Sequence, residues 1–176
     1  MTKQRIAIDM DEVMADPVSR FLEWYERDHG IALKLDQLHG KKVYQIVSEE
    51  HREIVLRYPH EVNFFKDLKV MADSQEVIRR LSEKYEIFVA SAAMEFQHSL
   101  FDKHVWLQTH FDFIPWKNYV FCGAKTIIHA DFLIDDHAYN FQDFTGEGIL
   151  FTALHNVHET GYRRVNNWRE VAELFL

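Results

Sequence analysis

Short apolar runs bounded by charged residues recur along this chain. Such runs are typical of strands that are buried on both faces of a parallel sheet. They lie at residues 6–8, 87–90, 120–122, 132–134 and 149–152. Segments with apolar residues at helical spacing separate most of them. Strands that alternate with helices predict an α/β fold with a doubly wound parallel sheet.

The segment after the first predicted strand breaks this pattern. Asp16 followed by Pro17 predicts the start of a helix, and Gly30 predicts its end. Residues 31–68 show no strand pattern and only one further helical stretch, at 49–58, which Pro59 interrupts. We therefore expect a small, mostly helical cap at residues 16–69, inserted after the first strand. Residues 1–15 and 70–176 would form the α/β core.

Regular alternation returns from residue 73. Asp73 with Glu76 predicts a capping box ahead of a helix that leads into strand 87–90. A further helix is expected at about 96–110. The last helix begins at Asn166 or Asn167.

Composition limits size and class. The 176 residues, 47% of them hydrophobic, suffice for one good core but not for two full domains. The formal charge of -8 argues against binding of a nucleic-acid polymer. A small phosphorylated ligand remains compatible, because one local site can be positive on an acidic protein.

Compartment and assembly are only loosely constrained. The single Cys122 excludes an internal disulfide, and no signal-peptide pattern precedes Asp9, so a cytoplasmic location is expected. No apolar window approaches 18 residues, so no contact with a membrane is expected. A homo-oligomer is compatible with the sequence.

Acidic pairs follow two of the predicted strands. Asp9 and Asp11 come after residues 6–8, and Asp135 and Asp136 come after residues 132–134. The carboxyl ends of parallel strands meet at one edge of a sheet, where ligands bind. Carboxylates gathered there would repel one another unless a hard cation such as Mg²⁺ lay between them. The pattern predicts one metal-dependent active site.

Two further polar residues follow strands. Ser91 closes strand 87–90, and the small Ala92 after it leaves room for backbone N–H groups to approach an anion. Lys125 follows strand 120–122, where its charge could hold a phosphate oxygen. A carboxylate pair, a hydroxyl, a lysine and a second carboxylate pair, in this order, indicate phosphoryl transfer through an aspartyl phosphate.

These residues resemble the four ordered motifs of the haloacid dehalogenase superfamily: Asp9–Val13, Ser91, Lys125 and Asp135–Asp136. Their flanks resemble the 5'(3')-deoxyribonucleotidases in particular, in segments at 8–16, 64–68, 124–126, 131–136, 149–152, 155–156 and 167–170. The similarity runs from near residue 6 to near residue 172. It implies a Rossmann-like fold and a Mg²⁺-dependent phosphohydrolase that acts on deoxyribonucleoside 5'-monophosphates, with 3'-monophosphates as a further substrate class.

The resemblance also implies roles for the acidic residues. Asp9 would be the nucleophile, and Asp11 the general acid and base. Mg²⁺ would be held by Asp9, Asp135 and the backbone carbonyl of Asp11. Asp136 would lie behind the residues that bind the ion, or would bind it through water.

The same resemblance makes Ser91 and Lys125 the residues that hold phosphoryl oxygens. Tyr44, Phe64 and Phe65 could form an apolar slot for the nucleobase, although the two phenylalanines also suit packing between cap and core. The sequence departs from the family at three positions, so the resemblance implies the phosphate chemistry more strongly than the base specificity. They are Glu12, where many relatives have glycine; Pro17, where animal nucleotidases carry an aromatic residue; and Ala92, where those relatives have a hydroxyl residue.

Three alternatives remain open at this point. A receiver-like signalling domain uses similar residues, but there the lysine comes last, whereas here Asp135 and Asp136 follow Lys125. A phosphatase of the same superfamily acting on a sugar phosphate or another small phosphomonoester would share the core residues, and only the cap would differ. A non-catalytic binding protein is disfavoured, because no motif residue is missing.

Overall fold

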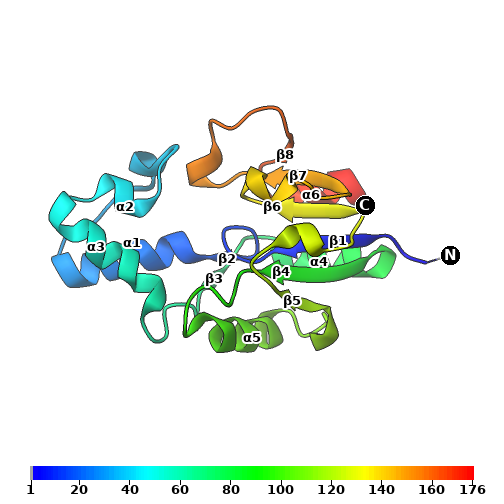
Figure 1. Ribbon diagram of the computed structural model, residues 1–176, viewed down its shortest axis with the longest axis horizontal. Coiled ribbons are helices and arrows are strands. Elements are labelled where there is room, and N and C mark those ends of the chain that lie inside the picture. The colour runs from blue at the N-terminus through cyan, green and yellow to red at the C-terminus, as the bar shows by residue number, and fades with distance from the viewer. Residues whose placement is uncertain (1) are drawn as a thin grey trace.

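The computed structural model describes residues 2–176 as one α/β structure with two sheets (Figure 1). The strands are β1 (Arg5–Asp9), β2 (Ala15–Asp16), β3 (Lys69–Val70), β4 (Glu86–Ser91), β5 (Tyr119–Phe121), β6 (Phe132–Asp135), β7 (Glu147–Phe151) and β8 (Arg163–Val165). The α-helices are α1 (Pro17–His29), α2 (Val43–Ile46), α3 (Glu49–Arg57), α4 (Ser74–Lys84), α5 (Ser99–His110) and α6 (Trp168–Phe175). Short 3₁₀ helices include η4 (Lys125–Ile127), η5 (Ala138–Phe141) and η6 (Leu154–Asn156).

The main sheet has six parallel strands in the order β5-β4-β1-β6-β7-β8. Strand β1 lies between β4 and β6, where Ile6 pairs with Ile87 and Ile8 pairs with Ile134. The strand order reverses beside β1, as it does in doubly wound sheets. The predicted parallel α/β fold is confirmed, and β8 is a strand that the apolar pattern did not predict.

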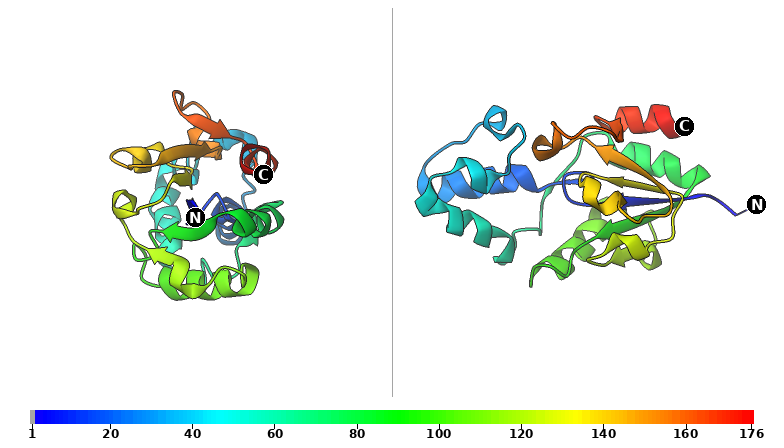
Figure 2. Two further views of the ribbon diagram at one scale, coloured as in Figure 1. Left: turned by 90° about the vertical axis from the view of Figure 1, so that its right-hand side faces the viewer. Right: turned by 45° about the horizontal axis from the view of Figure 1, so that its top comes forward.

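The two faces of the sheet are covered differently. Ile6 and Ile8 belong to the main core, together with buried residues of α4, α5 and α6. Helices α4 and α6 lie side by side on that face (Figure 2). Ala7 and Leu133 point to the other face, where Phe144 and the region of η5 cover them. The small side chains of Ala7 in β1 and Ala90 in β4 suit this face, because the cluster that packs on it is small.

Helices α1, α2 and α3 lie together beyond the carboxyl ends of the sheet strands (Figure 1). Strands β2 and β3, which pair antiparallel, are the two crossings between these helices and the sheet. Asp16 caps α1 by accepting a hydrogen bond from the Ser19 N–H at 2.9 Å, and Gly30 ends the helix with φ 67°. Both helix signals are confirmed, whereas the domain division at residues 16–69 stays a prediction.

The predicted capping box at Asp73 and Glu76 is wrong. Asp73 takes a left-handed φ of 65°, and its side chain makes no capping hydrogen bond to α4. Its carboxylate instead accepts a hydrogen bond from Arg169 of α6 at 2.8 Å. A tertiary ion pair has replaced the local cap. At α6, Asn167 is the cap. Its side chain accepts hydrogen bonds from the backbone N–H groups of Arg169 and Glu170.

Within residues 2–176, none of the helices has the length and apolar character that crossing a lipid bilayer requires.

One buried hydrogen bond ties the last helix to the first loop. The indole N–H of Trp168 donates to the Val13 carbonyl at 2.8 Å, and Trp168 is 1% exposed. Trp168→Phe leaves that carbonyl without a partner and should lower the free energy of unfolding by about 1–3 kcal/mol, measured by urea denaturation. Trp116→Phe is the control, because Trp116 is 76% exposed and should change stability by less than about 0.5 kcal/mol. Equal losses in both variants would contradict this account.

Candidate active site

The two acidic pairs meet at the carboxyl edge of the sheet. Asp9 ends β1 and Asp135 ends β6, and because Ile8 pairs with Ile134, the two aspartates that follow are neighbours. Carboxylate oxygens of Asp9, Asp135 and Asp136 lie within 4.8 Å of one another, and all three residues are buried. The structure thus brings together the residues that the sequence pattern predicted to meet. Their roles stay predictions.

A buried lysine lies between these carboxylates. Lys125, from η4, donates to Asp9 and, at 2.6 Å, to Asp135 Oδ2. Burial alone would lower the pKa of Lys125, but the charges of Asp9 and Asp135 raise it above its ordinary value. Lys125 therefore stays protonated and balances part of the negative charge.

The pKa of Asp9 is raised well above its ordinary range, first by burial and then by Asp135 and Asp136, while Lys125 acts in the opposite direction. Burial also raises the pKa of Asp136. One buried ammonium therefore does not compensate for three buried carboxylates. A divalent cation with a preference for oxygen ligands fits this group of side chains.

Asp135 is held by two further donors. The side-chain amide of Asn140 donates to both Asp135 oxygens at 3.0 Å, and the backbone N–H of His137 donates to Oδ1 at 2.9 Å. Sequence reasoning missed Asn140, because its only signal is its position five residues after Asp135. These bonds fix the orientation of the Asp135 carboxylate.

Asp11 has a separate cationic partner that sequence reasoning also missed. The Lys103 ammonium lies 2.5 Å from Asp11 Oδ2, 3.2 Å from Ser91 Oγ and 4.6 Å from the centre of the Phe65 ring. Lys103 is 1% exposed. Its position three residues before Trp106 puts it on the same face of the helix, but nothing in the local sequence marks Asp11 as its partner. In the described part of the chain, Asp11 Oδ1 is buried without a hydrogen-bond partner, so it can receive an incoming group.

A cavity of about 600 Å³ opens over these residues. Asp9, Asp11, Lys125 and Asp135 line it from the sheet side. Tyr44, Phe64 and Phe65 line it from the opposite side, along with Lys41 and Lys42.

The aromatic residues of this wall are also packed into the protein. Phe64 is fully buried and packs edge-on against Trp24, with ring centres 5.2 Å apart. Phe65 stacks on Phe96 at 5.7 Å. Packing therefore accounts for much of both side chains, and a contact with a base stays a prediction.

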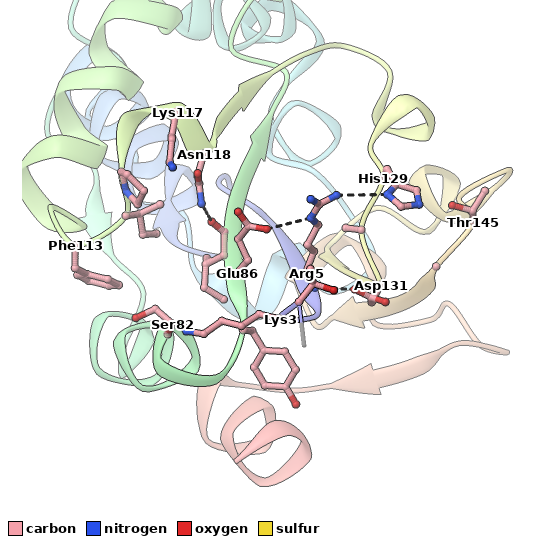
Figure 3. Close-up of a pocket in the computed structure, with 17 residues that line it drawn as sticks. Lys3, Arg5, Ser82, Glu86, Phe113, Lys117, Asn118, His129, Asp131 and Thr145 are labelled. Atoms are coloured by element: carbon pink, nitrogen blue, oxygen red, sulfur yellow. Dashed lines mark hydrogen bonds and ion pairs between the residues drawn. The ribbon is translucent and has the colours of Figure 1, made fainter.

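A second, larger cavity of about 980 Å³ lies at the opposite, amino end of the strands (Figure 3). Two of its charged side chains form an ion pair: Arg5 donates to Glu86 at 3.0 Å, and Arg5 also lies 3.5 Å from a ring nitrogen of His129. None of the predicted site residues lines it. The cavity at the carboxyl edge is thus the candidate active site.

Comparison with known proteins agrees with this geometry. Residues 3–176 match the model of the family "5' nucleotidase, deoxy (Pyrimidine), cytosolic type C protein". A Staphylococcus epidermidis protein named "Putative 5'(3')-deoxyribonucleotidase" is 43% identical over 99% of this chain and 97% of its own length. The 5'(3')-deoxyribonucleotidase of Bacillus subtilis is 37% identical over 99% of both chains.

Solved structures agree on the fold. A haloacid-dehalogenase (HAD) family hydrolase from Deinococcus radiodurans, with bound phosphate and sodium, superposes with a TM-score of 0.62 at 11% identity and covers 98% of this chain and 97% of its own. The HAD-type protein YfnB from Bacillus subtilis, bound to magnesium, gives 0.60 at 11% identity over 99% of both chains. Since the family match spans nearly every residue and two relatives exceed 30% identity over almost their whole lengths, the chain belongs to the 5'(3')-deoxyribonucleotidase family of phosphoric monoester hydrolases.

Proposed function

We propose that this enzyme releases phosphate from deoxyribonucleoside 5'-monophosphates, with 3'-monophosphates as a second class, in a Mg²⁺-dependent reaction through an aspartyl phosphate on Asp9. One observation carries the proposal: Asp9, Asp11 and Asp135 meet two buried lysines at the base of one cavity. The names of the relatives support the substrate class.

Mg²⁺ would be held by Asp9, Asp135 and the backbone carbonyl of Asp11, with Asp136 acting through water. The group of oxygen donors, with fewer lysines than carboxylates, supports this choice of ion. When bound, the ion neutralises charge on the carboxylates and on the phosphate.

In the first step, an Asp9 oxygen attacks phosphorus and the bond from phosphorus to the nucleoside oxygen breaks. Asp11 gives its proton to that leaving oxygen. In the second step, Asp11 takes a proton from water, the water oxygen attacks phosphorus, and the bond to Asp9 breaks. Lys125 and Ser91 hold the phosphoryl oxygens, and the fixed charge of Lys125 opposes the burial that would keep Asp9 protonated.

Substrate choice would depend on the wall opposite the acids. Tyr44 and Phe65 offer apolar surface to a base, and Lys41 and Lys42 add positive charge near the opening. A phosphate-release screen across deoxyribonucleotides, ribonucleotides and sugar phosphates tests this choice, and a preference for sugar phosphates would contradict it. A cytoplasmic location and a homo-oligomer stay predictions.

Asp9→Asn removes the attacking oxygen's charge and should lower phosphate release from a deoxyribonucleoside 5'-monophosphate by at least about a thousandfold. The thermal unfolding midpoint should show that the variant is folded. Asp143→Asn, in an exposed turn, is the control and should keep wild-type activity. A folded Asp9→Asn enzyme that retains more than a few per cent of activity would exclude Asp9 as nucleophile.

Asp11→Asn removes the proton donor and should lower kcat for a nucleoside monophosphate by about 10²–10⁴-fold. The loss should be smaller for 4-nitrophenyl phosphate, whose leaving group departs without a proton. Steady-state kinetics on both substrates measure the difference. Equal losses on the two substrates would count against the general-acid role.

Lys103→Met removes the ammonium that holds Asp11, and we expect kcat for a nucleoside monophosphate to fall by about 10²-fold. Because Lys103 acts through Asp11, the double variant Lys103→Met/Asp11→Asn should lose less than the product of the two single losses. Lys117→Met, an exposed lysine far from the site, is the control. Losses that multiply would show that Lys103 does not act through Asp11.

A further inference from the structure

A second group of metal-ligating side chains lies beside the proposed Mg²⁺ site. Ligand atoms of Asp136, His137 and His155 lie within 4.8 Å of one another. The two imidazole rings are tilted by 32° with centres 4.5 Å apart. The proposed reaction gives neither histidine a role, so the group needs its own explanation.

Of the three residues, His155 makes the fewest hydrogen bonds. Its side chain is 10% exposed, and both ring nitrogens are buried without a hydrogen-bond partner among residues 2–176. Nε2 lies 3.6 Å from Asp136 Oδ2, which is too long for a hydrogen bond but suits two ligands of one ion. Leaving a buried polar ring without a partner costs about 1–3 kcal/mol, so a ligand that binds between these atoms is favoured.

Glu12 explains which nitrogen of His155 would bind an ion. Its Oε2 lies 3.4 Å from His155 Nδ1, whereas Asp136 Oδ2 lies nearest the other ring nitrogen, Nε2. A carboxylate only accepts, so it favours the proton on Nδ1 and leaves the Nε2 lone pair facing Asp136. Carboxylates orient metal-binding histidines in this way. Glu12 has a left-handed φ of 59°, a conformation that costs a non-glycine residue about 1–2 kcal/mol.

His137 supplies the third donor. Its Nδ1 lies 2.8 Å from Asp136 Oδ2, and its Nε2 lies 3.1 Å from the ammonium of the exposed Lys42. Binding an ion through Nδ1 would place the ring proton on Nε2, and Lys42 would then turn to solvent. The exposure of Lys42 makes that movement inexpensive.

We infer that Asp136, His137 and His155 form a second cation site, which takes Zn²⁺ and similar transition-metal ions rather than Mg²⁺. Two imidazole nitrogens and one carboxylate are a donor set typical of such ions, whereas Mg²⁺ prefers oxygen ligands. The inference goes beyond the proposed function and does not depend on it.

The test is calorimetric titration of Zn²⁺ alone into the full-length protein in the presence of excess Mg²⁺. We expect one Zn²⁺ per chain, and binding at least about a hundredfold weaker in His155→Gln and His137→Gln. His158→Gln is the matched control, since this exposed histidine lies three residues after His155 and should leave the affinity unchanged. His137 is 26% exposed in its side chain, so its variant tests the site even if His155→Gln does not fold.

Co²⁺ gives an independent readout, because nitrogen ligation at low coordination number produces visible absorption bands. These bands should appear in the wild type and disappear in the His155→Gln and His137→Gln variants. Absence of Zn²⁺ binding would overturn the inference. Zn²⁺ binding that excess Mg²⁺ abolishes, or that both histidine variants retain, would place the ion at Asp9 and Asp135 and overturn it equally. Phosphate release with Mg²⁺ is measured separately and can succeed in either case.

Discussion

Mutual repulsion among buried carboxylates is the constraint around which this site is built. The parallel pairing of β1 and β6 places Asp9 beside Asp135, and neither can move away without breaking the register. Burial makes their charges costly, as the raised pKa of Asp9 indicates. Lys125 relieves part of that cost by contacting both carboxylates, and Asn140 adds hydrogen bonds to Asp135. The remaining negative charge is what would attract a divalent ion.

The structure pairs the two aspartates of the first motif with different lysines. Asp9 contacts Lys125 and is buried, whereas Asp11 contacts Lys103 and has a side chain that is 34% exposed. Different surroundings are the usual means by which two nearby carboxyl groups take different roles. In the proposed reaction the buried Asp9 would attack phosphorus, and the more accessible Asp11 would exchange a proton with the leaving oxygen and then with water.

The strand pattern predicted the sheet and the meeting of the acidic pairs, because strands buried on both faces are unusually apolar and their ends are marked by charge. Residues whose environment depends on distant contacts were missed. Asp73 resembled a helix cap, but its carboxylate pairs with Arg169. Lys103 looked like an ordinary helix residue, but it contacts Asp11, which lies 92 residues away in the sequence. Local sequence carries no record of such partners. Strand β8, with two arginines among its three residues, lacks the apolar run that marked the other sheet strands.

A crystal structure grown with Mg²⁺ and orthophosphate would test the central claim most directly. The account predicts one Mg²⁺ ion coordinated by oxygens of both Asp9 and Asp135, with Lys125 displaced from between them onto a phosphate oxygen and phosphorus in line with an Asp9 oxygen. A structure at saturating Mg²⁺ in which Lys125 still bridges the two carboxylates, with the ion and the phosphate bound elsewhere, would contradict it.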